Sequence, residues 1–269
     1  MERRDKVVIM AKPRTLIIRT AGTNCDYETK MAFELAGSVA VRVHINDLIS
    51  GKEKLSNYQL LAIPGGFSYG DDIASGKILA NEVKNKLGNQ IREFASAGKP
   101  IIGICNGFQV LVKMGLLPDE RTFSQSTTLT FNDSDKFECR WIKLQKAQKK
   151  SICIWAKGIP EFIELPVAHG EGKFISANKL TLEELEKNNQ VVFRYSDGVA
   201  STDKFPLNPN GSQNAIAGIC NKKGNVFGLM PHPERYIWKI QHPSRKGVGV
   251  NGESGSGLQI FINAVNYVK

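Results

Sequence analysis

A cysteine in the first half of the sequence has the neighbours that a catalytic nucleophile needs. Cys105 lies between Gly103 and Gly107, after the apolar run 100–104 and before the amphipathic segment 108–114. This order of strand, turn and helix is that of a nucleophile elbow, in which the turn lifts the side chain above the carboxyl edge of a sheet. We therefore expect Cys105 to act as a nucleophile, although a free cysteine is more commonly a small buried apolar residue.

The segment after Cys105 also predicts a site that stabilises negative charge. The N-terminus of a helix favours the thiolate over the thiol, and the backbone N–H of Asn106 can point at a developing oxyanion. We expect a second oxyanion donor from Gly66, in the glycine-rich loop that follows the apolar run 60–63. That loop lacks the Gly-Lys-Ser/Thr ending of a phosphate-binding loop, so we favour the oxyanion role.

His232 and Glu234 are the candidate base and its orienting group. They follow the apolar run 226–230 and so should lie at the carboxyl end of a strand, where open α/β sheets carry their sites. Pro233 favours an extended backbone at His232, and side chains two apart in an extended segment point the same way. Glu234 can then set the tautomer of the imidazole and stabilise the imidazolium formed when Cys105 loses its proton. The alternative is a tight turn that merely exposes a histidine.

Alternating short β-branched runs and helical patterns in the first 117 residues predict βαβ units and a parallel sheet. The predicted elements there are strands 15–19, 38–45, 60–63 and 100–104 and helices 27–36 and 89–97. Beyond them we predict a β-rich region 121–177, a helix 181–188, a strand 190–195, a hairpin of 215–220 and 225–230, and a last helix 257–267. We divide the chain into a basic N-terminal extension, 1–14, and one domain, 15–269.

Composition excludes several classes of protein. The formal net charge is +10, but the basic residues are spread along the chain, which favours a solvated basic surface over nucleic-acid binding. The five cysteines are scattered and form no Cys-x-x-Cys pair, which argues against a zinc or redox motif and favours the reducing cytoplasm. No apolar run approaches the ~18 residues of a membrane span.

Two other groups have residue types that do chemistry. Cys25 lies in a turn after the first predicted strand, but no His-x-Glu sequence accompanies it, so we expect a structural role. Asp71 and Asp72 are adjacent acids, for which capping of the next helix is favoured over metal binding or acid–base catalysis. We therefore predict no metal site.

The order of these motifs resembles that of class I glutamine amidotransferases. The motifs are Pro-Gly-Gly after a strand (64–66), Gly-Ile-Cys-Asn-Gly-Phe-Gln (103–109) and Pro-His-Pro-Glu (231–234). More narrowly, four segments are similar to the glutaminase subunits of phosphoribosylformylglycinamidine synthases: Gly-Thr-Asn-Cys-Asp (22–26), Gly-Gly-Phe-Ser-Tyr-Gly-Asp-Asp (65–72), Ala-His-Gly-Glu-Gly (168–172) and Asn-Pro-Asn-Gly-Ser (208–212). The resemblance runs from about residue 15 to residue 267.

The resemblance implies a three-layer, flavodoxin-like α/β fold around a mostly parallel sheet. It implies that the chain hydrolyses glutamine through a thioester on Cys105, with His232 and Glu234 completing a triad. The ammonia would pass to a synthetase subunit that uses ATP and Mg²⁺ to make formylglycinamidine ribonucleotide in purine biosynthesis, with a small third subunit in the same complex. No cofactor is implied for this chain itself.

The same resemblance places three more residues near the substrate. Gln109 is expected to help hold glutamine, and His169 and Gly170 are expected to lie beside it. His169 belongs to a second His-x-Glu sequence, but Gly170 leaves that pair free to turn, so we assign the base to His232.

Two other functions compete with this one. A γ-glutamyl hydrolase also needs a cysteine and a histidine but acts alone, and the loop 67–72 argues against it. A non-enzymatic regulatory module is disfavoured because the residues of the triad are intact.

Overall fold

The computed structural model describes residues 11–244 and 253–269. Residues 1–10 of the predicted basic extension lie outside the described part of the chain, and the first strand, β1, begins at Arg14.

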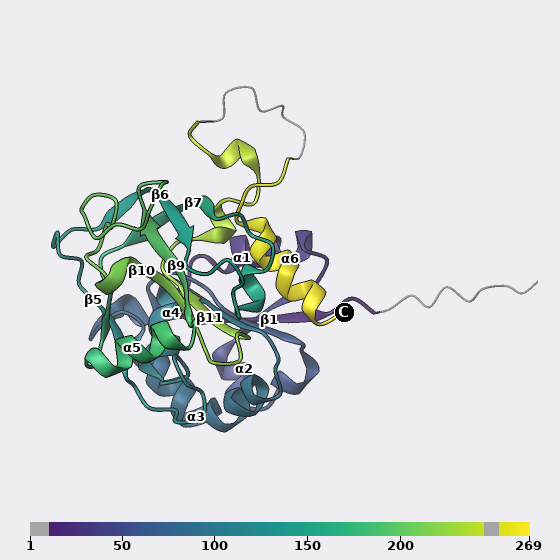
Figure 1. Cartoon of the computed structure of the whole chain (residues 1–269). Helices are drawn as coiled ribbons and strands as arrows, with labels where there is room; N and C mark the ends of the chain where they lie inside the picture. Colours follow the sequence, from purple (N-terminus) through teal and green to yellow (C-terminus); the bar gives the residue numbers. More distant parts are fainter. Residues whose placement is uncertain (1–10, 245–252) are drawn as a thin grey trace, which may run out of the picture.

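The described residues build a central sheet of nine strands in the order β2-β1-β3-β4-β11-β10-β9-β6-β7, and a separate pair, β5 with β8 (Figure 1). The strands are β1 (Arg14–Arg19), β2 (Val39–His44), β3 (Leu60–Ile63), β4 (Ile101–Ile104), β5 (Thr127–Thr130), β6 (Glu138–Lys146), β7 (Phe162–His169), β8 (Lys173–Ser176), β9 (Val191–Ser196), β10 (Ile216–Cys220) and β11 (Val226–Leu229). The helices are α1 (Asp26–Leu35), α2 (Ile45–Ile49), α3 (Lys77–Ser96), α4 (Asn106–Lys113), α5 (Lys179–Lys187) and α6 (Leu258–Tyr267).

The run from β2 through β1, β3 and β4 to β11 is parallel throughout. Every residue of β3, β4 and β11 is buried, because strands covered on both faces need apolar side chains at every position. Antiparallel pairing begins at the β10–β11 hairpin and continues through β9, β6 and β7. The predicted α/β fold around a mostly parallel central sheet is confirmed.

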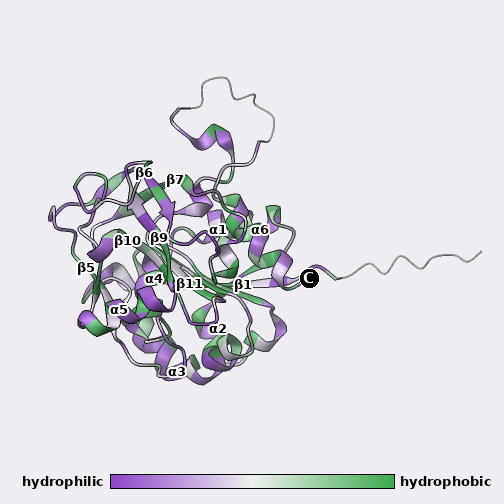
Figure 2. Cartoon of the chain, in the orientation of Figure 1, coloured by the Kyte–Doolittle hydropathy of each residue, from purple (hydrophilic) through white to green (hydrophobic). Residues whose placement is uncertain are grey.

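Helices cover both faces of this sheet. α1 packs against α6, and α3 packs against α4, so that α1 and α6 lie above the sheet and α2 and α3 below it in the view of Figure 1. Hydrophobic residues follow the central strands, whereas hydrophilic residues occupy much of the outer helices (Figure 2). Within the described residues, no helix is both long and apolar enough to cross a membrane.

The structure corrects one predicted helix substantially. The predicted helix 89–97 is only the last part of α3, which runs from Lys77 to Ser96. Its earlier turns place Leu79, Val83 and Leu87 in the core at helical spacing, but Gly88 and the polar residues between them weaken the pattern in the sequence. The other predicted helices and strands agree with the structure to within a few residues.

The parallel half of the sheet brings four loops to one edge. The segment around Cys25 follows β1, the Gly65–Gly66 loop follows β3, Cys105 follows β4, and His232 follows β11. These four strands are neighbours in the sheet and point the same way. Their carboxyl ends therefore bring the loops together, as in other open α/β sheets.

Candidate active site

Cys105 is held in a strained backbone conformation between β4 and α4. Its φ is 51° and its ψ is −105°, a region that non-glycine residues adopt rarely and at a cost of about 1–3 kcal/mol. A Cβ on Gly103 would lie 2.5 Å from the carbonyl oxygen of Gly107, and a Cβ on Gly107 would lie 1.8 Å from that of Ile63. Only glycines allow so close an approach, so strand and helix meet in the geometry of a nucleophile elbow.

The thiol of Cys105 lies at a helix N-terminus and is almost enclosed. The residue is 6% exposed, and its Sγ lies 3.6 Å from the carbonyl oxygen of Ala168 at the end of β7. Helix α4 begins at Asn106, and the first N–H groups of a helix have no acceptor within it. The Asn106 N–H is thus placed for the predicted oxyanion role.

The side chains of His232 and Glu234 form a buried pair. His232 has the expected extended backbone, with φ −104° and ψ 90°, and Pro233 follows as the first residue of a 3-10 turn, Pro233–Arg235. Nδ1 of His232 lies 2.6 Å from Oε1 of Glu234, and the two residues are 2% and 0% exposed. The backbone N–H of His232 donates to the carbonyl oxygen of Pro166, which ties the start of this turn to β7.

Burial and charge act in opposite directions on the imidazole. Burial lowers the pKa of His232, but the Glu234 carboxylate and the thiols of Cys105 and Cys25 raise it more, so the pKa lies well above its ordinary value. Among the described residues, neither Nε2 of His232 nor Oε2 of Glu234 has a hydrogen-bond partner. A buried imidazole with one nitrogen fixed and the other free is suited to accept and return a proton.

Gly65 is the point at which the surrounding side chains converge. A Cβ there would lie 2.8 Å from Cε1 of His232, 3.2 Å from Sγ of Cys25 and 3.5 Å from Cβ of Cys105. The next residue, Gly66, has a φ of 138°, which side-chain-bearing residues rarely adopt. The glycine-rich loop thus lies directly against the cysteine and histidine, where the predicted oxyanion donor must be.

The side chain of Asn106 ties this loop to the elbow helix. Its Oδ1 accepts a hydrogen bond from the hydroxyl of Ser68 at 2.6 Å, and its Nδ2 donates to Asp71 and to Oε1 of Gln109, each at 3.0 Å. Nε2 of Gln109 donates to the carbonyl oxygen of Glu171 at 2.5 Å. Both ends of the Gln109 amide are therefore used inside the protein, and its role in holding glutamine stays a prediction.

The capping role expected for Asp71 and Asp72 is wrong. Helix α3 begins after Gly76, without a side-chain cap. Oδ1 of Asp71 instead accepts hydrogen bonds from the Gly76 N–H and from Asn106, both at 3.0 Å, and burial raises the pKa of its carboxyl group. Asp71 therefore holds the loop against the elbow helix.

His169 lies in a different environment from His232. It is buried at the end of β7, with Nδ1 3.1 Å from Oδ1 of Asn132. Burial, followed by the charge of His232, lowers its pKa to about 3, so the ring is neutral. Both carboxylate oxygens of Glu171 lie 3.2 Å from the Ser75 N–H. Glu171 is thus not used to orient His169, which agrees with the assignment of His232 as base.

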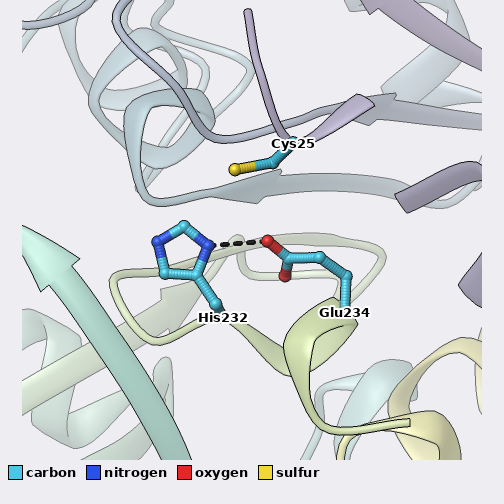
Figure 3. A group of neighbouring side chains, drawn as sticks. All are labelled: Cys25, His232 and Glu234. Carbon is cyan, nitrogen blue, oxygen red and sulfur yellow. Dashed lines mark hydrogen bonds and ion pairs between the residues drawn. The ribbon is translucent and has the colours of Figure 1, made fainter. Parts of the chain in front are cut away.

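Cys25 joins this site, although we expected it to be structural. Its Sγ accepts a hydrogen bond from Nη2 of Arg235 at 3.1 Å and points toward the imidazole of His232 (Figure 3). Burial raises the pKa of the Cys25 thiol, although its contact with His232 lowers it. The sequence contains one indirect sign of this placement, since Cys25 follows a parallel strand whose carboxyl end lies at the same sheet edge.

Fold and site together define an α/β protein with a cysteine at an elbow and a His–Glu pair beside it. The family model of the CobB/CobQ-like glutamine amidotransferase domain matches residues 12–268. This chain belongs to that family of glutamine amidotransferases.

Individual relatives agree with this assignment. The chain is 48% identical over 260 residues to the phosphoribosylformylglycinamidine synthase subunit PurQ of Dehalococcoides mccartyi, covering 97% of this chain and 99% of the relative. The subunit PurQ of Archaeoglobus fulgidus is 42% identical over 271 residues, with 95% and 97% covered. Among solved structures, PurLQS from Thermotoga maritima matches with a TM-score of 0.73 and 33% identity, covering 96% of this chain and 100% of that chain.

Proposed function

We propose that this chain is the glutaminase subunit of a phosphoribosylformylglycinamidine synthase, in which Cys105, His232 and Glu234 release ammonia from glutamine. The observation that carries the roles of these residues is the strained Cys105 at the sheet edge, enclosed together with a histidine whose Nδ1 is fixed by a buried carboxylate at 2.6 Å. The high identity to PurQ subunits over nearly the whole chain supports the choice of reaction.

The first half of the reaction forms a thioester. The Cys105 thiol gives its proton to Nε2 of His232, and the sulfur attacks the side-chain amide carbon of glutamine. The amide oxygen takes up the electron pair of its carbonyl bond, and the N–H groups of Gly66 and Asn106 stabilise the resulting oxyanion. When the carbonyl re-forms, the carbon–nitrogen bond breaks, and the imidazolium of His232 protonates the leaving nitrogen to give ammonia.

The second half returns the enzyme to its starting state. His232 takes a proton from water, and the hydroxide oxygen attacks the thioester carbon. The carbon–sulfur bond then breaks, glutamate leaves, and the Cys105 sulfur regains a proton from the imidazolium. The Glu234 carboxylate stabilises the imidazolium in each half, which agrees with the raised pKa of His232.

The ammonia serves a synthetase subunit of the same complex, which uses ATP and Mg²⁺ to form the amidine, together with a small third subunit. The similarity of this chain to a chain of PurLQS from Thermotoga maritima supports such an assembly. The proposed reaction needs no cofactor in this chain. We place the complex in the cytoplasm, which fits the five free cysteines.

The proposal is tested with the complex reconstituted from this chain and its synthetase partner. Cys105→Ala should abolish amidine synthesis from glutamine and leave synthesis from ammonium unchanged, because only the thioester step uses this sulfur. Cys139→Ser, which changes an exposed thiol, is the matched control and should retain both activities. Glutamine-dependent synthesis by Cys105→Ala at the normal rate would overturn the proposed role of Cys105.

A further inference from the structure

One face of helix α4 is buried and polar, and the reaction proposed above gives its side chains no role. The face carries Asn106, Gln109 and Lys113, whose spacing of three and four residues places them along one side of the helix. These residues are 2%, 3% and 8% exposed. Because buried amide and amino groups are costly unless they are hydrogen-bonded, the contacts of this face show which segments it holds.

The first segment is the loop 65–76, which connects β3 to α3. The side chain of Asn106 holds the earlier part of this loop. Lys113 holds its end, because Nζ of Lys113 donates to the carbonyl oxygen of Ser75 at 2.5 Å. A Cβ on Gly76 would lie 3.1 Å from the backbone nitrogen of Val110. The end of the loop therefore lies directly on α4.

The second segment is 169–172, which ends β7 and leads into β8. Nε2 of Gln109 donates to the carbonyl oxygen of Glu171 at 2.5 Å, and Nζ of Lys113 lies 3.9 Å from Oε2 of Glu171. Both carboxylate oxygens of Glu171 lie 3.2 Å from the Ser75 N–H. Glu171 and Lys113 thus hold the N–H and the carbonyl group of Ser75, and they join two segments that are far apart in the chain.

The Lys113–Glu171 pair is buried together with the backbone that it holds. The two side chains are 6% and 11% exposed. Burial lowers the pKa of Lys113, whereas the carboxylates of Glu171 and Asp71 act to raise it. Removing one partner of a buried pair leaves the other charge uncompensated, whereas removing both is tolerated far better. Variants of this pair can therefore separate an effect on stability from an effect on the reaction.

We propose that Lys113 and Glu171 are positioning residues, which fix the loop 65–76 and the segment 169–172 to the elbow helix as one unit. The loop carries Gly66, the proposed oxyanion donor, and the segment carries the residues expected beside glutamine. This role rests on the proposed function. Since a misplacement of about 1 Å can cost about 100-fold in rate, loosening one of several anchors of the loop should cost roughly 10-fold in acylation.

The test compares three variants of the full chain in the reconstituted complex: Lys113→Met, Glu171→Gln and the double variant. Single-turnover acylation of Cys105 is measured at saturating glutamine, with urea unfolding for stability and circular dichroism to show that each variant is folded. The single variants should be less stable, and the double variant should regain much of that stability because neither charge remains. Its acylation should stay roughly 10-fold slower, because the anchor on Ser75 is still missing.

A role in stability alone predicts a different result, in which acylation recovers together with stability. Acylation at the unmodified rate in the double variant, or in folded Lys113→Met, would overturn the positioning role. Synthesis from ammonium, which bypasses this chain, should continue in all three variants. Glutamine use by Cys105→Ala at the normal rate would instead overturn the proposed function on which this role rests.

Lys223→Met is the matched control. Nζ of Lys223 also donates to the carbonyl oxygen of a serine, Ser96, at 3.0 Å, and lies 3.8 Å from Oε1 of Glu120. Lys223 is in the turn before the amino end of β11, whereas His232 follows the carboxyl end of that strand. Acylation by Lys223→Met should equal that of the unmodified chain. An equal loss in Lys223→Met and Lys113→Met would show that the effect is not specific to the anchor on Ser75, and would also overturn the proposal.

Discussion

Gly65→Ala should disable the site by moving the imidazole of His232, without a large loss of stability. The added Cβ would lie 2.8 Å from Cε1 of His232. Carbon atoms prefer separations of about 3.5–4.0 Å, so ring and loop must separate by roughly 0.7 Å, the difference between 2.8 Å and the shorter of those limits. The backbone itself accepts alanine, because Gly65 is not among the glycines with positive φ.

The expected loss of kcat in Gly65→Ala follows from how precisely the catalytic groups must be positioned. A misplacement of about 1 Å can cost about 100-fold in rate, whereas overpacking one methyl group in a core costs about 1–3 kcal/mol. We therefore expect a loss of glutaminase kcat that approaches 100-fold in a protein that is still folded. The assays are single-turnover acylation of Cys105 at saturating glutamine and urea unfolding.

A matched variant distinguishes displacement of the ring from a general effect of adding a methyl group. Gly88→Ala adds a Cβ within α3, where it meets the ring of Phe123 at 3.1 Å, away from the site. It should keep acylation within a few-fold of the unmodified rate. Normal acylation by Gly65→Ala, with unchanged stability, would show that the contact between Gly65 and His232 does not position the base.

Three further results are expected. His232→Ala should slow thioester formation by about 10²–10⁴-fold, the usual contribution of a general base. Glu234→Gln should slow it less, because the imidazole remains. A larger loss in Glu234→Gln than in His232→Ala, measured by rapid quench, would contradict these roles. His169→Ala should raise the KM for glutamine and leave acylation at saturating glutamine largely intact; a block of acylation there would refute the assignment of the base. The pKa of His169 is about 3 in the folded protein but ~6.5 in the unfolded chain. Between about pH 6.5 and pH 3 the unfolded chain therefore binds a proton at His169 that the folded protein does not. The free energy of unfolding should fall there by up to roughly 1.4 kcal/mol for each pH unit of acidification. His169→Gln should reduce that slope in urea unfolding between pH 6 and pH 4, and an unchanged slope would show that His169 is not held neutral.

The sequence predicts the elbow well because its determinants are local. The apolar run before Cys105, the two flanking glycines and the amphipathic segment after it occupy a few adjacent residues, and each has a direct physical meaning. The pairing of His232 with Glu234 is local as well, but the reason differs from the predicted one: His232 is extended, whereas Glu234 lies in the 3-10 turn Pro233–Arg235. The β10–β11 hairpin is likewise encoded in its short turn.

Contacts between distant segments are much harder to predict. Cys25 and Arg235 are 210 positions apart, and nothing in the periodicity of either segment indicates that the thiol lies against the imidazole. Their meeting depends on the strand order, which places β1 and β11 on either side of β3 and β4. The role of Asp71 could not be predicted for a similar reason, since its partner Asn106 is the first residue of helix α4, 35 positions away.

The most direct test of the account is to trap the intermediate. The complex is mixed with glutamine and the other substrates, quenched in acid during steady-state turnover, and digested for mass spectrometry. We predict a γ-glutamyl group on the peptide that contains Cys105 and none on the peptide that contains Cys25. A glutamyl group on Cys25, or ammonia release from glutamine with Cys105→Ala at the normal rate, would contradict the assignment of Cys105 as the nucleophile.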